Sequence, residues 1–109
     1  MIPISILREA EIELREAVQF YETRCAGLGL DFEREIKAAI ELIPRSPRRW
    51  PLQPDGTRRC LIHRFPYFIV YAMHEGRVWV IAFAHCRRKP GYWSARAKRA
   101  EPRRGRRRE

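Results

Sequence analysis

Residues 57–93, TRRCLIHRFPYFIVYAMHEGRVWVIAFAHCRRKPGYW, carry the pattern that decides the fold. Residues 58–63 alternate in polarity, whereas 67–73 and 77–85 are nearly continuous apolar runs. Glu75-Gly76, between the two runs, is a typical signal for a tight hairpin turn. We therefore predict three antiparallel strands, of which the last two form a hairpin. Alternation along the last strand predicts two faces, one with Val78, Val80, Ala82 and Ala84 and the other with Trp79, Ile81, Phe83 and His85.

The chain before this sheet changes from strand to helix periodicity. Residues 2–7 are rich in β-branched types and predict a first strand. From Arg8 apolar residues recur on one helix face, Gly27 and Gly29 end this helix, and a second helix runs from about Asp31 to Pro44. Because neither helix can bury its apolar stripe alone, the sheet is their natural partner. The predicted fold is α+β, a small antiparallel sheet packed on an N-terminal helical hairpin, in the order strand, helix, helix, strand, strand, strand.

The two helices are joined to the sheet by an irregular connector. Residues 44–56, PRSPRRWPLQPDG, contain four prolines, which exclude regular structure. We expect Trp50 to anchor this segment onto the domain. Asp55-Gly56 is a turn signal that leads into the sheet.

Charge is the strongest compositional signal. The 109 residues carry a net charge of +10, and residues 96–109 hold eight lysines and arginines against two glutamates. We predict a globular domain over residues 1–95 and a flexible basic tail over residues 96–109. A strongly basic protein surface attracts nucleic acid phosphates or an acidic protein. A run of like charge, such as residues 96–109, can also serve only as a solubilising tail.

Compartment and cofactors can also be predicted. The sequence has no apolar run long enough for a membrane span and no segment that resembles a signal peptide. Three cysteines without tight spacing favour a reducing cytoplasm. No spacing of cysteines and histidines suits a metal, since the adjacent His85 and Cys86 point to opposite faces of a strand. We expect neither a metal nor another cofactor.

The end of the last strand gathers the residues with chemical potential. If this strand pairs antiparallel with the preceding one, its end meets the start of that strand, and basic and aromatic side chains gather there. Such a patch suits RNA, because cations hold phosphates and rings stack on bases. His85 could act as a general acid or base and an arginine could stabilise charge on a phosphate. The candidate catalytic residues are Arg87, His85 and Tyr92, and the candidate target-binding residues are Arg64, Tyr67, Arg88, Lys89 and Trp93.

Simpler interpretations of the same residues stay open. His85 can be a hydrogen-bonded structural histidine. Tyr92 and Trp93 can fold back to cap the core. Arg64 can pair with a carboxylate such as Glu75 or one on a helix.

Four stretches make the chain resemble the RelE/ParE superfamily of small bacterial toxins from type II toxin–antitoxin systems. These are EAEIELREAVQFYE, GLGLDFEREIKAAIELI, RFPYFIVY and AHCRRKPGYW, and the likeness is greatest to ParE-like and plasmid stabilisation proteins. The resemblance implies a cytoplasmic growth inhibitor that forms a hetero-oligomer with a cognate antitoxin. For such a toxin, we expect the apolar grooves beside the hairpin and sheet to hold the antitoxin.

The resemblance implies two alternative targets. RelE-like members cleave mRNA on the ribosome without a metal, using basic residues and usually a C-terminal tyrosine, whereas ParE-like members act on DNA gyrase. Arg87 matches the RelE arginine at the end of the last strand, but the arginine of the preceding strand is replaced by Phe68 and the tyrosine position falls on Trp93. These departures favour a ParE-like toxin over a metal-independent endoribonuclease. A non-toxic RNA-binding module that uses the basic tail is a further alternative.

Overall fold

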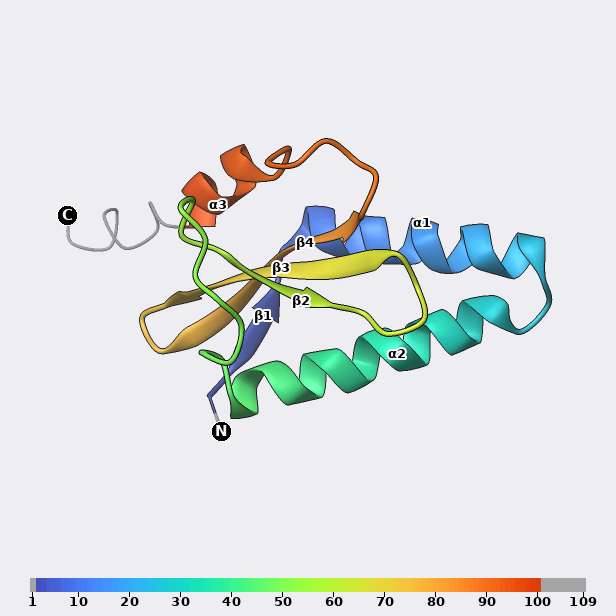
Figure 1. Cartoon of the computed structure of the whole chain (residues 1–109), viewed down its shortest axis with the longest axis horizontal. Helices are drawn as coiled ribbons and strands as arrows, with labels where there is room; N and C mark the ends of the chain where they lie inside the picture. The colour runs from blue at the N-terminus through green and yellow to red at the C-terminus, as the bar shows by residue number, and fades with distance from the viewer. Residues whose placement is uncertain (1, 101–109) are drawn as a thin grey trace.

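The computed structural model describes residues 2–100, and side chains as far as residue 98. The chain forms a four-stranded sheet in the order β1-β4-β3-β2, with a hairpin of two long helices (Figure 1). The predicted α+β fold and its order of elements are confirmed, with one helix added at the end. The elements are β1 (Ile4–Ile6), α1 (Arg8–Arg24), α2 (Leu28–Leu42), a 3-10 turn η1 (Ile43–Arg45), β2 (Arg58–Leu61), β3 (Tyr67–His74), β4 (Arg77–His85) and α3 (Ser94–Ala100).

The sheet is mixed, whereas the sequence predicts an antiparallel one. β2, β3 and β4 are antiparallel as expected, but β1 pairs parallel with β4 over residues 78–80. α1 begins at Arg8, two residues after β1 ends. The outer edge of β4 beyond Val80 is therefore not paired with β1.

A β-bulge corrects the predicted faces of β4. Tyr71 pairs with Val80 and Val70 pairs with Ala82, so Ile81 is an extra residue opposite the partner strand. An extra residue reverses the alternation beyond it. Phe83 consequently joins the core beneath the helical hairpin, whereas Ile81, Ala82 and Ala84 face the other side of the sheet.

Two cores lie on the two faces of the sheet. The larger one is formed by the hairpin with β1, β3 and β4 and includes Phe32, Ile36 and Tyr71, all with no more than 1% of their surface exposed. The smaller one lies under α3 and the segment that precedes it, and Trp93 is its largest buried side chain. The predicted tail boundary at residue 96 falls inside α3, and residues 101–109 of that tail lie outside the described residues.

The helical hairpin closes more tightly than the sequence predicts. α2 begins at Leu28, three residues before the expected start near Asp31, so Gly29 lies inside the helix. The carboxylate of Glu22 accepts hydrogen bonds from the backbone N–H groups of Gly27 and Gly29 at 2.9 and 3.0 Å. Gly27, the N-cap residue, has no side chain to cap the helix, and the Glu22 carboxylate accepts hydrogen bonds from the first backbone N–H groups in its place. The helix can therefore begin at Leu28. A Cβ at Gly29 would lie 2.5 Å from the carbonyl oxygen of Val18, so the close approach of the helices requires glycine there.

Candidate functional site at the end of strand β4

The register of the hairpin brings the end of β4 to the start of β3, as the sequence predicts. Tyr67 pairs with His85, and the backbone N–H of Cys86 donates to the carbonyl of Pro66 at 2.8 Å. The ring centroids of Tyr67 and His85 lie 5.1 Å apart in an edge-to-face arrangement. These two side chains help to line a shallow pocket of about 210 Å³ between α1 and β4. The pocket is completed by Glu13, Glu16, Ala17, Phe20, Phe83 and Arg88.

His85 is half-buried and has one ring nitrogen in use. Its Nδ1 accepts a hydrogen bond from the backbone N–H of Arg87 at 3.0 Å. A neutral imidazole that accepts at Nδ1 carries its proton on Nε2. This contact is the hydrogen bond expected of a structural histidine, and it also fixes the ring at the rim of the pocket.

Glu13 on α1 organises the site, although it is not among the site residues predicted from the sequence. Its carboxylate accepts hydrogen bonds from the backbone N–H of Phe83 at 3.1 Å and from the Tyr92 hydroxyl at 2.8 Å. Arg96 contacts both carboxylate oxygens, at 2.9 and 3.0 Å, in a bidentate pair. Arg88 adds a longer ion pair at 3.5 Å. One side chain that is 12% exposed thus holds together α1, β4, the segment after β4 and α3.

A helical wheel contains a signal that could have found Glu13. The residue lies three positions after Ala10 and four before Ala17, and both alanines are buried. It therefore shares the face that α1 turns to the sheet. A carboxylate at such a position needs partners, because an unpaired buried charge is costly.

Tyr92 is held between cations and does not project toward solvent. The guanidinium carbon of Arg88 lies 3.8 Å from its ring centroid and that of Arg96 lies 5.1 Å away. Burial, and then the hydrogen bond donated to Glu13, raise the pKa of Tyr92 well above its usual range. The hydroxyl is consequently a hydrogen-bond donor at neutral pH and poorly suited to act as a base.

The other predicted site residues do not all join this cluster. Arg64 turns toward α2, where its guanidinium lies 3.8 Å from Asp31 and 3.6 Å from Glu35. Trp93 is only 1% exposed, and its Nε1–H donates to Asp55 at 3.2 Å. Arg64 thus pairs with carboxylates on a helix, and Tyr92 and Trp93 fold back onto the domain, as the simpler interpretations of these residues predict.

Arg87 and Lys89 are exposed in the turn that follows β4. Arg88, which is paired with Glu13 but still half exposed, is the residue of this cationic turn that lines the pocket. No group of three metal-ligating side chains is found within the part of the chain that the structure describes. No helix among the described residues is long and apolar enough to cross a membrane.

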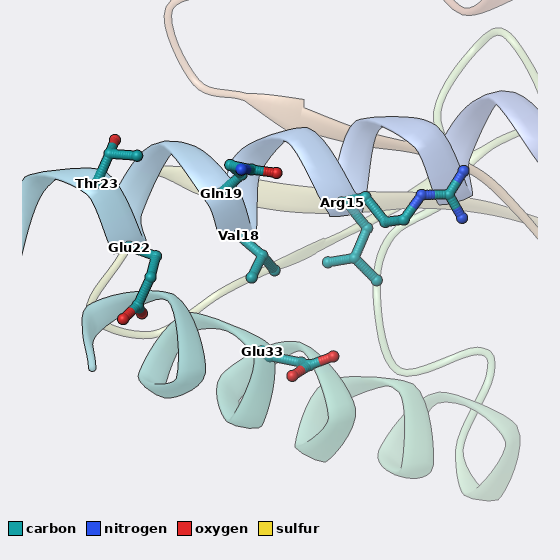
Figure 2. Close-up of a pocket in the computed structure, with 7 residues that line it drawn as sticks. Arg15, Val18, Gln19, Glu22, Thr23 and Glu33 are labelled. Atoms are coloured by element: carbon teal, nitrogen blue, oxygen red, sulfur yellow. The ribbon is translucent and has the colours of Figure 1, made fainter. Parts of the chain in front are cut away.

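A second hollow lies along the helical hairpin. It has a volume of about 440 Å³ and is lined by Leu14 and Val18 with a polar rim. Figure 2 shows Val18 and Glu22 of α1 directed toward α2, from which Glu33 completes the rim. This hollow lies between the two helices and is a candidate for one of the apolar grooves expected beside the hairpin and sheet.

Comparison with known proteins gives a consistent result. A family model described as the ParE toxin of the type II toxin–antitoxin system parDE matches residues 4–90. A solved structure titled "Chromosomal ParDE TA system from P. aeruginosa" contains a chain with a TM-score of 0.68 and 14% sequence identity. The superposition covers 78% of this chain and 96% of that one, and it shows the same fold. No curated protein sequence matches the chain.

Proposed function

The chain belongs to the ParE toxin family of type II toxin–antitoxin systems, and from this premise we propose that it arrests growth by inhibiting DNA gyrase and is neutralised by a cognate antitoxin. The proposal gives the site at the end of β4 a binding role. It assigns target contact to Arg87, Arg88 and Lys89, with Tyr67 and His85 forming the floor beneath them. The site is expected to act in the cytoplasm without a cofactor.

The engagement of Glu13 is the observation that carries this choice. A nuclease needs cations and a proton acceptor that are free to meet the substrate. Here Arg96 and the Tyr92 hydroxyl are already bound to the carboxylate, and Arg88 is partly neutralised by it. A negative charge at this position also repels a phosphate. The arrangement therefore supports a protein-binding surface over a phosphate-cleaving centre.

The mRNA endoribonuclease remains the second candidate because of one contact. The backbone N–H of Arg87 donates to Nδ1 of His85, so the histidine ring is fixed at the start of the turn that carries the exposed Arg87. This pair could bind a phosphate and move a proton without a metal.

The groove along the hairpin supports the antitoxin part of the proposal. Its apolar lining by Leu14 and Val18 suits the apolar face of a partner helix or an extended segment. The net charge of +10 would attract an antitoxin with acidic segments. The expected product is a toxin–antitoxin hetero-oligomer.

Expression in a bacterial host, with and without the neighbouring small gene, tests both parts. We expect growth arrest with DNA double-strand breaks and an SOS response, intact mRNA, and rescue by the neighbouring gene. The purified toxin should inhibit gyrase supercoiling, and the double variant Arg87→Ala/Lys89→Ala should lose this inhibition. The matched control Arg34→Ala/Lys37→Ala removes the same charge from exposed positions of α2 and should retain it.

Three other outcomes would contradict the proposal. Cleavage of ribosome-bound mRNA that Arg87→Ala abolishes would establish the endoribonuclease. An absence of growth arrest at good expression would favour the non-toxic RNA-binding module. Arrest that the neighbouring gene does not relieve would remove the antitoxin assignment.

A further inference from the structure

The proposed function leaves unused a strongly basic surface at the other end of β3. We call residues 44–59 the basic connector, because five arginines are accompanied there by a single acidic residue, Asp55. The connector runs from the 3-10 turn after α2 into the first two residues of β2. In Figure 1 it lies at the opposite end of the sheet from the loop between β2 and β3. It is thus separate from the pocket near His85. The five arginines are Arg45, Arg48, Arg49, Arg58 and Arg59.

The connector is fixed to the domain although it is irregular. The hydroxyl of Tyr71, a fully buried residue of β3, donates to the carbonyl of Pro47 at 2.6 Å. Arg58 donates to the carbonyl of Trp50 at 2.6 Å, and Leu52 forms an isolated β-bridge with Arg58. The sequence-based expectation that Trp50 anchors this segment is confirmed by its packing against the core. A surface ordered in this way loses little conformational entropy when a partner binds.

Three of the five arginines of the connector have no carboxylate partner within the described chain. Arg45, Arg48 and Arg49 are exposed, and none forms an ion pair within residues 2–98. Asp55 cannot serve them, because its carboxylate is occupied. One oxygen accepts from the backbone N–H and hydroxyl of Thr57 at 3.0 and 2.7 Å, and the other accepts from Trp93.

The geometry points to the sugar–phosphate backbone of duplex DNA as the partner of the basic connector. Guanidinium groups match phosphate oxygens with two donors at once, and duplex DNA carries one negative charge per about 1.7 Å of its axis. Single strands fit less well, because they need exposed rings for stacking. The ring of Trp50 is already engaged, packed edge-on against Tyr71 at 6.2 Å and stacked by Arg49 at 5.4 Å.

The position of α3 supports the same partner. Ser94, Ala97 and Lys98 share a hollow of about 270 Å³ with the turn 55–57 of the connector. The described chain therefore ends beside the connector, and the sequence continues from there with five further arginines. The choice of DNA over duplex RNA rests on the proposed function, because gyrase acts on DNA. The inference that the connector binds phosphates does not depend on gyrase.

The test measures binding of the full-length purified protein to a labelled DNA duplex of mixed sequence, by fluorescence anisotropy over a range of salt concentrations. The variant Arg45→Gln/Arg48→Gln/Arg49→Gln should bind at least about tenfold more weakly at 0.1 M salt, and its slope of log K against log salt should fall by about 2–3. The matched control Arg15→Gln/Arg34→Gln/Lys37→Gln removes the same charge from exposed helix positions. It should keep the wild-type slope. The variant Arg45→Lys/Arg48→Lys/Arg49→Lys, which preserves the charge, should keep it too.

Each alternative outcome overturns the inference in a distinct way. Equal losses in the connector and control variants would mean that net charge alone attracts DNA. No loss in either would remove the connector as a binding surface. Tighter binding of an RNA duplex of equal length would reject DNA as the partner. If the connector variant kept its affinity for DNA but lost affinity for an acidic peptide, the partner would be a protein. Gyrase is absent from this assay, so its result is independent of the proposed target.

Discussion

Among the partly exposed residues of α1, Glu13 should cause the largest loss in the free energy of unfolding when it is replaced. Glu13→Ala removes the acceptor of the Phe83 N–H, the Tyr92 hydroxyl and the Arg96 guanidinium, whose side chain is only 16% exposed. Breaking a buried ion pair from one side costs about 3–5 kcal/mol, and an orphaned buried donor costs about 1–3 kcal/mol. Because the site is slightly open to water and these terms overlap, we expect a loss of about 3–4 kcal/mol in the free energy of unfolding. Glu13→Gln keeps one acceptor oxygen and should lose about half as much.

Urea denaturation of the purified protein measures this loss. The midpoint should fall while the slope stays constant, as expected for a change in stability alone. The matched control is Glu16→Gln, one turn further along α1 and exposed, which should change the stability by less than about 0.5 kcal/mol. In a double-mutant cycle, Glu13→Gln and Arg96→Gln should show a coupling of more than about 1 kcal/mol. Stability of Glu13→Ala within about 0.5 kcal/mol of the wild type would refute the reasoning.

Three further predictions follow from the packing. Gly29→Ala should destabilise the fold by about 1–3 kcal/mol because its Cβ meets the Val18 carbonyl; a gain in the urea midpoint from improved helix propensity would contradict this. Arg64→Gly should leave stability unchanged or raise it by about 0.5 kcal/mol, since Arg64 has a φ of 78° and its ion pairs are exposed; a lower midpoint would show that the pairs matter. Burial raises the pKa of Cys60 to about 11 and that of Tyr71 to about 12. The folded state thus keeps protons that the unfolded state has already lost, and the free energy of unfolding should fall by a few kcal/mol between about pH 9 and 12; a flat profile over this range would exclude the effect.

The hairpin at the centre of the fold could be predicted because its signals are local. The Glu75-Gly76 turn forms as expected, with φ values of 51° and 75°. Once this turn is fixed, the lengths of the two apolar runs place Tyr67 opposite His85. The meeting of the end of β4 with the start of β3 therefore needs no information from elsewhere in the chain.

The bulge and the pairing of β1 could not be predicted because their causes are distant in sequence. Ile81 is apolar like its neighbours, so nothing in the run 77–85 marks the position at which alternation reverses. The parallel pairing of residues 4–6 with residues 78–80 depends on the crossover through the helical hairpin. The early start of α2 likewise depends on Glu22, a residue of the preceding helix.

The short length of β1 explains why the candidate site exists at all. β1 covers β4 only as far as Val80, so the backbone groups beyond it face outward without a partner strand. Exposed edge groups invite unwanted strand pairing unless they are covered. Glu13 accepts from the Phe83 N–H, and Arg96 donates to the carbonyl of Ile81 at 3.3 Å. The two side chains that protect the edge then pair with each other, which draws α3 onto the sheet.

This protection also determines the charge that a target meets. Because Glu13 must be present to satisfy β4, it is available to bind the Tyr92 hydroxyl and the guanidinium of Arg88. The cations left for a partner are Arg87 and Lys89, which the carboxylate does not reach, and the half-exposed guanidinium of Arg88, which it neutralises only in part. A chain that closed the same edge with a longer β1 would have no need of this carboxylate, and its basic residues would be free for a phosphate. The structural requirement at the edge of β4 thus supports the proposed protein-binding role of the site over phosphate chemistry.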